Sequence, residues 1–490
     1  MINYLQPDYE VVRDKDRCIK CKVCVRQCAN KVHQYDEKRD VLYVDNSKCV
    51  NCHRCVTLCP ANALKIVKTD HCFKPSANYT EDIIKDIYRQ ADSGGVLLSS
   101  MGTPKAYPVY WDKMLLNASQ VTNPSIDPLR EPMEIRTFLG RKPEAIEYEP
   151  DGSIKVDKYP NLELKTPIMF SAMSYGSISK NAHLCLARAA EELGTFYNTG
   201  EGGLHEDLYK YGANTIVQVA SGRFGVHADY LDAGRAIEIK IGQGTKPGMG
   251  GHLPGDKVTP EIAAVRNKPL GEDVISPSKI PGIETREDLR ALVSDLRARS
   301  DGRPIGIKIA AGKIEKDLEY CVFAEPDFIT IDGRGGATGA SPAIVRDSTS
   351  VPTIYALYRA RRYLDSVKSD ISLVITGGLR VSSDFAKAIA MGADAVAVAS
   401  AAMVAAACQQ YRICGSGMCP VGVATQDPEL RKRLHIEAAA QRVANYLHCS
   451  TEELRTFARI TGHRNIHDLT VGDLCTISRE ISEYTNIPHA

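Results

Sequence analysis

The sequence predicts an α/β protein, in which a small α+β domain precedes a (β/α)8 barrel. The barrel is predicted because eight short apolar, β-branched runs alternate with amphipathic runs between residues 166 and 400. That number of strands and that length of chain are typical of a (β/α)8 barrel. The small domain is predicted because eight of the sixteen cysteines fall between Cys18 and Cys59, which indicates a metal-binding unit.

The residues that follow the first predicted strand favour a barrel over a doubly wound sheet. A doubly wound sheet would place nucleotide-binding glycines after its first strand, but Met173-Ser174-Tyr175-Gly176 stands there. Helical runs such as 182–193, 286–299 and 383–391 lie between the predicted strands. The eight strands are expected at 168–173, 195–199, 216–220, 236–241, 305–310, 328–332, 373–376 and 395–399.

Composition excludes several classes of protein. The 490 residues include 61 basic and 60 acidic side chains, a net charge of +1, which argues against a nucleic-acid binder. The longest uncharged apolar stretch, residues 395–408, is shorter than the roughly 20 residues that span a bilayer. No apolar export signal follows Met1. We therefore expect a cytoplasmic protein with neither a membrane nor a nucleic-acid partner.

The cysteines of the small domain form two runs, each with spacing C-x2-C-x2-C-x3-C. These runs resemble those of two-cluster bacterial ferredoxins, where the fourth cysteine of each run ligates the other 4Fe–4S cluster. Zinc sites are the alternative, but paired C-x2-C motifs would leave the third cysteine unused. Ala29 replaces the usual proline after the first run. The expected ligand sets are Cys18, Cys21, Cys24 and Cys59 for one cluster, and Cys49, Cys52, Cys55 and Cys28 for the other.

Four regions are expected along the chain. Residues 1–75 contain 14 basic and 9 acidic side chains, a net +5, which could steer an acidic electron carrier or simply be a solvated surface. Trp111, in a proline-rich arm, is expected to be a packing anchor. The regions are a ferredoxin-like domain at 1–75, an extended arm at 76–160 with a helix near 81–90, the barrel at 161–425, and a helical segment at 426–490 with helices near 437–447 and 452–461.

Polar and glycine-rich residues follow the predicted strands, where barrel enzymes place their chemistry. Gly377-Gly378 and Ala399-Ser400 follow strands seven and eight, the usual phosphate position, where backbone N–H groups can approach an anion. Lys308 on strand five would place a cation at the barrel mouth, and beside a flavin that cation would stabilise negative charge on the reduced form. The alternative is that these glycines only form turns and that the lysine is an ion-pair partner.

A third cysteine group, Cys408-x5-Cys414-x4-Cys419, follows strand eight. Three cysteines are one short of a 4Fe–4S or zinc site, so the count fits a 3Fe–4S cluster; ordinary thiols are the alternative. The isolated cysteines are expected to be buried structural thiols: Cys72, Cys185, Cys321, Cys449 and Cys475.

Several motifs resemble the FMN domain of glutamate synthase. They are the segments 171–179, 200–203, 218–225 and 246–255, and the match extends through 339–342 and 419–429. With the ferredoxin-like runs, the chain resembles the shorter, archaeal-type large subunit. This resemblance implies a barrel that binds FMN and one 3Fe–4S cluster beside the two 4Fe–4S clusters.

The resemblance also implies roles for individual residues. Lys246 and Glu201 are the expected catalytic pair, and Arg266, His252 and Ser174 are expected to bind substrate. Met249 replaces a glutamate and His252 a glutamine of the longer enzymes, which leaves the identity of the oxo acid open. The expected FMN contacts are Ala172, Met173, Gln218, Lys308, Asp332, Gly377, Gly378, Ala399 and Ser400.

The activity implied is reductive amination of 2-oxoglutarate to L-glutamate through 2-iminoglutarate. The alternatives are a related enzyme such as an N-alkylglutamate synthase, and a non-catalytic electron-transfer subunit. No G-x-G-x-x-G follows a strand, so an NADPH-oxidising flavoprotein subunit or a ferredoxin is expected to supply electrons. The chain begins Met1-Ile2-Asn3 and has no amino-terminal cysteine nucleophile. A separate glutamine amidotransferase subunit and a separate β-helix subunit are therefore expected as partners.

Overall fold

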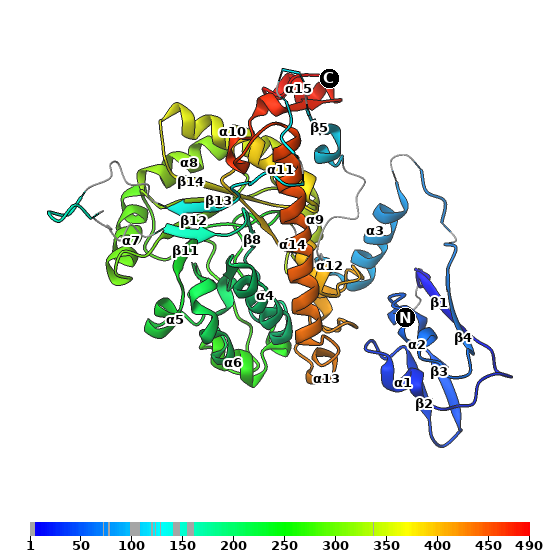
Figure 1. Cartoon of the computed structure of the whole chain (residues 1–490). Helices are drawn as coiled ribbons and strands as arrows, with labels where there is room; N and C mark the ends of the chain where they lie inside the picture. Colours follow the sequence, from blue (N-terminus) through cyan, green and yellow to red (C-terminus); the bar gives the residue numbers. More distant parts are fainter. Residues whose placement is uncertain are drawn as a thin grey trace.

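A computed structural model of the chain shows the small domain beside a barrel (Figure 1). It describes residues 5–71, 73–76, 79–98, 108–118, 121–122, 124–127, 129–140, 148–153, 161–336 and 338–490. Of the cysteines expected to be buried thiols, Cys185, Cys321 and Cys475 are buried, and Cys449 is exposed, so the expectation for Cys449 is wrong. Cys72 falls outside the described residues.

All eight predicted strands are confirmed, in one parallel sheet with the order β8-β15-β14-β13-β12-β11-β10-β9. The ends of this sheet meet where the backbone N–H of Phe170 donates to the carbonyl of Phe196 at 2.9 Å, which nearly closes the barrel. The strands are β8 (Ile168–Phe170), β9 (Tyr197–Asn198), β10 (Thr215–Ala220), β11 (Ala236–Lys240), β12 (Ile305–Ala310), β13 (Phe328–Asp332), β14 (Ser372–Thr376) and β15 (Ala395–Val398).

Each strand alternates between the two sides of the barrel wall. In β12, Ile305, Ile307 and Ile309 pack outward into the core shared with the helices, so Gly306 and Lys308 face the barrel interior. The same alternation in the other strands stacks the inward residues in layers. The lowest layer is apolar and includes Met169, Ile216, Ala236, Phe328, Val374 and Ala395.

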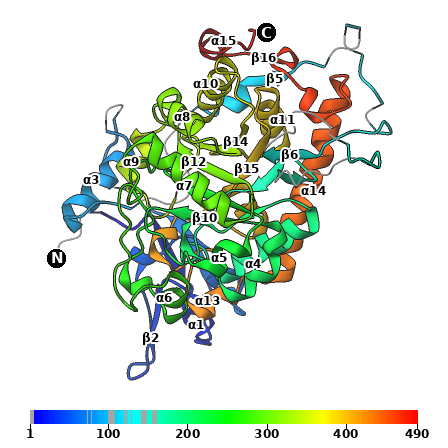
Figure 2. The same ribbon diagram turned by 90° about the vertical axis from the view of Figure 1, so that its left-hand side faces the viewer.

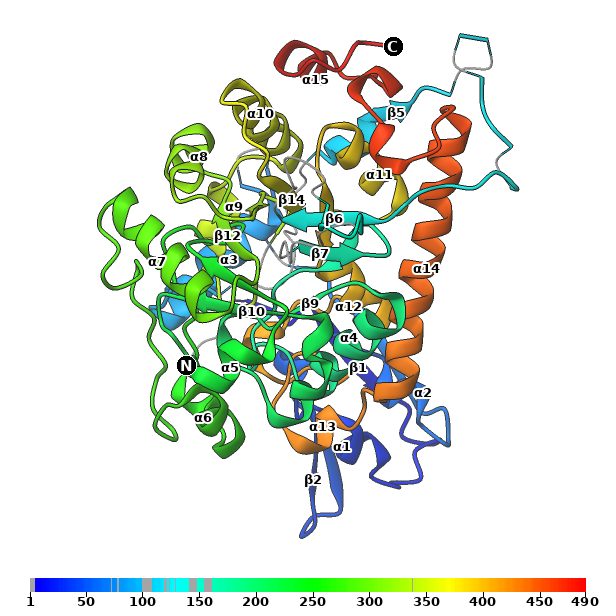
Figure 3. The ribbon, with the colours of Figure 1, turned by 60° about the vertical axis from the view of Figure 1, so that its left-hand side comes forward.

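An antiparallel pair closes the bottom of the barrel. β6 (Thr137–Gly140) and β7 (Asn161–Leu164) lie next to each other as an antiparallel pair (Figure 3). Their Leu139, Leu162 and Leu164 pack into the lowest layer. Because this end is filled with leucine side chains, space for a ligand is left at the opposite end, where the strands terminate.

Helices surround the sheet. The expected helices at 182–193, 286–299 and 383–391 are confirmed. The helices around the barrel and in its loops are α4 (Lys180–Leu193), α5 (Ala228–Ala233), α6 (Pro260–Arg266), α7 (Arg286–Arg299), α8 (Ile314–Phe323), α9 (Ala343–Ser348), α10 (Thr353–Ser366), α11 (Ser382–Ala390) and α12 (Ser400–Ala406).

The expectation of two short helices near 437–447 and 452–461 is wrong. One helix, α14 (Ile436–Ile460), runs through both segments beside α4. Ser450 and Thr451, between the two expected helices, are buried, and the Thr451 hydroxyl donates to the Leu447 carbonyl one turn earlier. The polar group of Thr451 is satisfied within the helix, so the helix continues through this residue. The tail also contains α13 (Pro428–Arg431), α15 (Arg479–Tyr484) and β16 (Leu474–Thr476).

The part of the arm around residues 111–116 packs on the barrel and its tail. β5 (Met114–Leu116) pairs antiparallel with β16 from the tail. Trp111 is buried, as expected of a packing anchor, and its carbonyl accepts a hydrogen bond from Lys387 at 2.8 Å. The region boundaries at 75, 160 and 425 stay predictions. Among the described residues, no helix is both long and apolar enough to cross a membrane.

The small domain repeats a short pattern. β1 (Tyr9–Arg13) pairs antiparallel with β4 (Leu64–Lys68), and β2 (His33–Asp36) with β3 (Val41–Val44). The helices α1 (Val23–Gln27) and α2 (Arg54–Thr57) lie between them. The expected helix near 81–90 is α3 (Glu81–Ser93), tied to this domain by Lys85 and Asp8 at 2.6 Å. In Figures 2 and 3, α1 lies beside α13 of the barrel tail.

Candidate functional site

A cavity of about 620 Å³ opens at the carboxyl ends of the barrel strands. It brings together every site residue that the sequence predicted for the barrel. Those residues are Ala172, Met173, Ser174, Glu201, Gln218, Lys246, His252, Arg266, Lys308, Asp332, Gly377, Gly378, Ala399 and Ser400, together with Cys408, Cys414 and Cys419.

The strand alternation explains why charged groups gather here. The inward residues of β11 are Ala236, Glu238 and Lys240, so polarity rises from the apolar bottom of the barrel toward its mouth. Glu238 accepts hydrogen bonds in the middle layer from Gln218 Nε2 at 2.7 Å and Thr330 Oγ1 at 2.9 Å. The amide nitrogen of Gln218, an expected FMN contact, is thus engaged inside the barrel.

Glu201 is the centre of a buried cluster of charges. Its carboxylate lies 2.5 Å from Lys240 Nζ, and both side chains are almost fully buried. Burial alone would raise the pKa of Glu201, but Lys240, Lys246 and Arg266 together hold it below its ordinary value. Glu201 therefore stays ionised. Gly251 leaves room for it, because a Cβ there would lie 2.3 Å from the carboxylate carbon.

Lys240 is a residue of the site that was not predicted from the sequence. The signal that could have identified it is the sequence Ala-Ile-Glu-Ile-Lys, where the charged Glu238 and Lys240 lie two positions apart on a strand buried on both faces. Such residues must face a polar interior or a ligand.

Lys246 and Arg266 complete the cluster. Burial, with the nearby charge of Lys240, lowers the pKa of Lys246 from 10.5 to about 8. Lys246 donates to the carbonyl of Gly250. Arg266 is also buried, which lowers its pKa to about 10, and its Nη2 donates to the Tyr175 carbonyl at 2.6 Å. Three cations thus surround one carboxylate, an arrangement suited to an anionic ligand.

The two other expected substrate residues support the loops of the site. The Ser174 hydroxyl accepts a hydrogen bond from the backbone N–H of Glu201 at 3.2 Å. His252 Nδ1 accepts from the Ser276 N–H at 3.3 Å, so a neutral ring has its proton on Nε2 and can donate it to a ligand. Burial and the nearby charge of Lys246 lower the pKa of His252. Met249, the other departure from the longer enzymes, is not part of the cavity wall.

The opposite part of the cavity fits a phosphate and a polar ligand. Gly377 and Gly378 have positive φ angles of 114° and 82°, and a Cβ at either would lie under 3.0 Å from backbone atoms of the loop after β13. Only glycine allows this close approach. Lys308 Nζ lies 3.4 Å from Asp332 Oδ2, while Asp332 Oδ1 is buried with no hydrogen-bond partner among the described residues. A ligand hydroxyl could donate to this oxygen.

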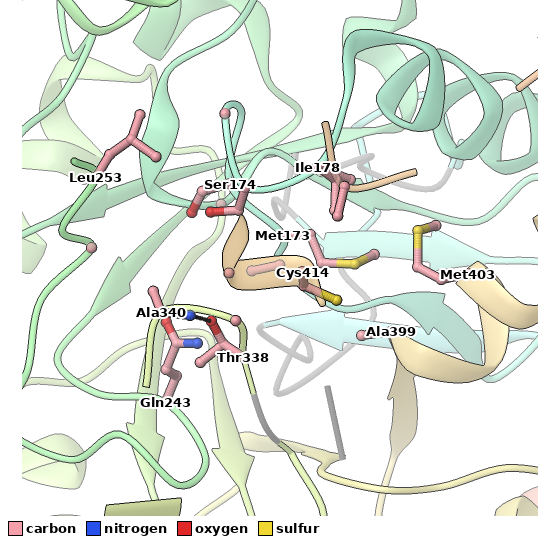
Figure 4. Close-up of a pocket in the computed structure, with 18 of the residues that line it drawn as sticks. Met173, Ser174, Ile178, Gln243, Leu253, Thr338, Ala340, Ala399, Met403 and Cys414 are labelled. Carbon is pink, nitrogen blue, oxygen red and sulfur yellow. Dashed lines mark hydrogen bonds between the residues drawn. The ribbon is translucent and has the colours of Figure 1, made fainter. Parts of the chain in front are cut away.

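The third cysteine group lies at the rim of the same cavity. Cys408 is close to Cys414 and Cys419, and burial together with these neighbours raises the pKa of Cys408 to about 11. Figure 4 shows Cys414 on the same side of the pocket as Met173 and Met403, with Gln243 and Ala340 on the other side. The cavity thus joins a polar site to a three-cysteine loop.

The structure also assembles the cysteines of the small domain. Cys18, Cys21, Cys24 and Cys59 line one small cavity, the set that the spacing predicts. In the other predicted set, the pKa of Cys55 is raised to about 12. Burial is the main cause, and the neighbouring Cys52, Cys28 and Cys49 add to it. Among the described residues, no three His, Cys, Asp or Glu side chains converge on the position of a single metal ion.

The fold and the site define a (β/α)8-barrel protein with an attached cysteine-rich domain. Residues 17–63 match the family model of the 4Fe-4S dicluster domain, and residues 105–464 match that of the conserved region in glutamate synthase. The chain is 49% identical to the archaeal-type glutamate synthase [NADPH] of Dehalococcoides mccartyi, over 91% of this chain and 90% of that protein. It is 47% identical to the archaeal glutamate synthase [NADPH] of Archaeoglobus fulgidus, over 92% and 90%.

The chain therefore belongs to the glutamate synthase family, and it includes an iron–sulfur domain. Among solved structures, a monotopic membrane protein, (S)-mandelate dehydrogenase, aligns with 80% of this chain and 95% of that one. The TM-score is 0.46 and the identity 14%, a similarity too weak to bear on function.

Proposed function

We propose that the chain is the synthase subunit of an archaeal-type glutamate synthase and reductively aminates 2-oxoglutarate to L-glutamate in the barrel mouth. The observation that supports this most directly is the excess of buried positive charge around Glu201. Lys240, Lys246 and Arg266 give three positive charges against one negative, so these four side chains have a net charge of +2. A dicarboxylate such as 2-oxoglutarate would neutralise it.

FMN is the proposed cofactor of the barrel. The glycines Gly377 and Gly378, with Ala399 and Ser400, would hold its phosphate through backbone N–H groups. Asp332 Oδ1 would accept a hydrogen bond from a ribityl hydroxyl. The remaining proposed contacts are Ala172, Met173, Gln218 and Lys308. When bound, FMN supplies the hydride that reduces the imine carbon.

The protein residues have distinct proposed roles. Arg266, aided by His252 and Ser174, would bind the substrate carboxylates and hold the keto carbon in place for attack by ammonia. Glu201, kept ionised, is suited to accept a proton from the attacking nitrogen. Lys246, with a pKa of about 8, is suited to donate a proton to the oxygen that leaves as water.

The proposed metal content is two 4Fe–4S clusters in the small domain and one 3Fe–4S cluster on Cys408, Cys414 and Cys419. The relatives are named as NADPH enzymes, so we propose that electrons come from NADPH through a separate flavoprotein subunit, with a ferredoxin as the alternative donor. Ammonia would come from a separate glutaminase subunit, with a separate β-helix subunit as a further partner.

The test is a product assay on the anaerobically purified full chain with a reduced low-potential dye and 2-oxoglutarate. Glutamate should form with ammonium and not with glutamine. Methylamine replaces ammonium in a parallel reaction, and faster formation of N-methylglutamate than of glutamate would contradict the proposal. Reduced clusters with no amino-acid product from any amine would identify the chain as an electron-transfer subunit instead.

A further inference from the structure

Two side chains connect the small domain to the three-cysteine loop of the barrel. The first is Tyr411, which lies between Cys408 and Cys414 in the sequence. Its hydroxyl donates to the backbone carbonyl of Cys52 at 3.4 Å. Tyr411 thus links the loop that would hold the third cluster to a ligand residue of the small domain.

The second side chain is Arg433, between α13 and α14. Its Nη1 donates to the carbonyl of Pro420 at 3.1 Å, and its Nη2 donates to the carbonyl of Gln27 at 3.1 Å. Pro420 follows Cys419, and Gln27 precedes Cys28. The partly buried guanidinium of Arg433 therefore links a backbone segment next to Cys419 with a backbone segment next to Cys28. The planar arrangement of its N–H donors allows it to bind two carbonyls at once.

Both contacts reach the same predicted ligand set. Cys52 and Cys28 belong with Cys49 and Cys55, although Cys28 comes from the other cysteine run. The cavity of the remaining set is lined by Ile19, whose side chain is 67% exposed. That set therefore borders solvent.

We propose that Tyr411 and Arg433 are positioning residues that hold the cluster of Cys28, Cys49, Cys52 and Cys55 against the three-cysteine loop. That cluster is then the inner one, and the cluster of the Cys18 set is the outer one, open to an external one-electron donor protein. Two electrons, delivered one at a time along this order, with two protons, reduce one imine to an amine. The inference rests on the proposed cofactors and not on the substrate.

Arg433 also affects the cluster that it adjoins. A cation close to an iron–sulfur cluster stabilises the reduced, more negative form and so raises the reduction potential. Removing the charge in Arg433→Gln should move one of the two 4Fe–4S potentials to a more negative value. Arg433→Lys keeps the charge but loses the fork, so it should leave the potential nearer that of the parent protein.

The experiment uses the anaerobic full chain with its clusters and flavin. EPR-monitored redox titration gives the potentials, and single-turnover mixing with dithionite, without 2-oxoglutarate, gives the rate of flavin reduction. Arg433→Gln should shift one 4Fe–4S potential, and both it and Tyr411→Phe should slow flavin reduction about tenfold or more with iron content unchanged. The matched controls are Arg39→Gln and Tyr43→Phe, exposed residues of the same domain, which should change neither quantity.

To identify which cluster's potential has shifted, Arg433→Gln is also made in a Cys18→Ser background, which alters the EPR signal of the outer cluster. The inference holds if the shifted signal is the one that Cys18→Ser leaves unaltered. It is overturned if the shift follows the Cys18 set, or if neither potential nor flavin reduction changes. These measurements contain no substrate, so a chain that forms no glutamate can still pass them, and a glutamate-forming chain can fail them.

Discussion

The small domain draws its cysteines from residues 18–59, whereas the barrel draws its site from strand ends spread over residues 172–419. Their cores differ just as much. The described core of the small domain consists of Val11, Val32, Leu64 and two of the cysteines themselves, while the barrel and its helices share one extensive apolar core. The small domain must therefore be stabilised largely by its metal, and the barrel by packing.

Iron removal should have the largest effect and separates the two regions most directly. Without iron, the small domain should unfold, since a core of this size supplies at most about 3–5 kcal/mol, while the barrel keeps its thermal transition. The intact protein should contain about eleven iron atoms per chain from two four-iron clusters and one three-iron cluster. Iron analysis, with limited proteolysis before and after chelation, tests this. A small domain that resists protease without iron would contradict the comparison.

Lys246→Ala should come next, with loss of glutamate formation by about 10²–10⁴-fold, the usual contribution of a positioned proton donor. FMN and iron should remain, because Lys246 belongs to the charge cluster around Glu201 and not to the proposed phosphate site at Gly377 and Gly378. The measurement is activity per bound flavin. A variant that loses FMN but keeps normal activity per flavin would show that Lys246 binds the cofactor.

The pH dependence of 2-oxoglutarate binding should show a smaller effect. Lys246 has a pKa of about 8 in the free protein, and a bound dicarboxylate favours its protonated form. Binding must then take up a proton above pH 8, so affinity should fall up to about tenfold per pH unit there. Calorimetry in two buffers measures the proton uptake. Lys246→Met should abolish this dependence, and an affinity in the parent protein that stays constant above pH 8 would refute it.

Cys414→Ser should have the smallest effect on the fold. The variant should contain about eight iron atoms, yet its barrel stability should change by under about 0.5 kcal/mol because the half-buried side chain lies at a cavity rim. Cys55→Ser, in the small domain, is the matched comparison and should destabilise its own region. An unchanged iron content and EPR spectrum in Cys414→Ser would remove the third cluster.

Much of both regions could be predicted from the sequence. The spacing of the cysteines indicated which four share a cavity. Cys59, from the second cysteine run, lines that cavity together with three cysteines of the first run. The apolar runs gave β12 and β13 with the bounds that the structure has. The continuous helix α14 was missed, because the hydrogen bond that satisfies Thr451 within the helix cannot be recognised from composition.

The sequence by itself predicted which cysteines should act as ligands and determined the positions of the strands, since both depend on spacings of a few residues that fix distances locally. Only the tertiary structure paired Lys240 with Glu201 and placed Tyr411 and Arg433 between the two regions. Those contacts join segments from 39 to 406 residues apart in the chain. Their geometry depends on how strands close and helices pack, which no local spacing specifies.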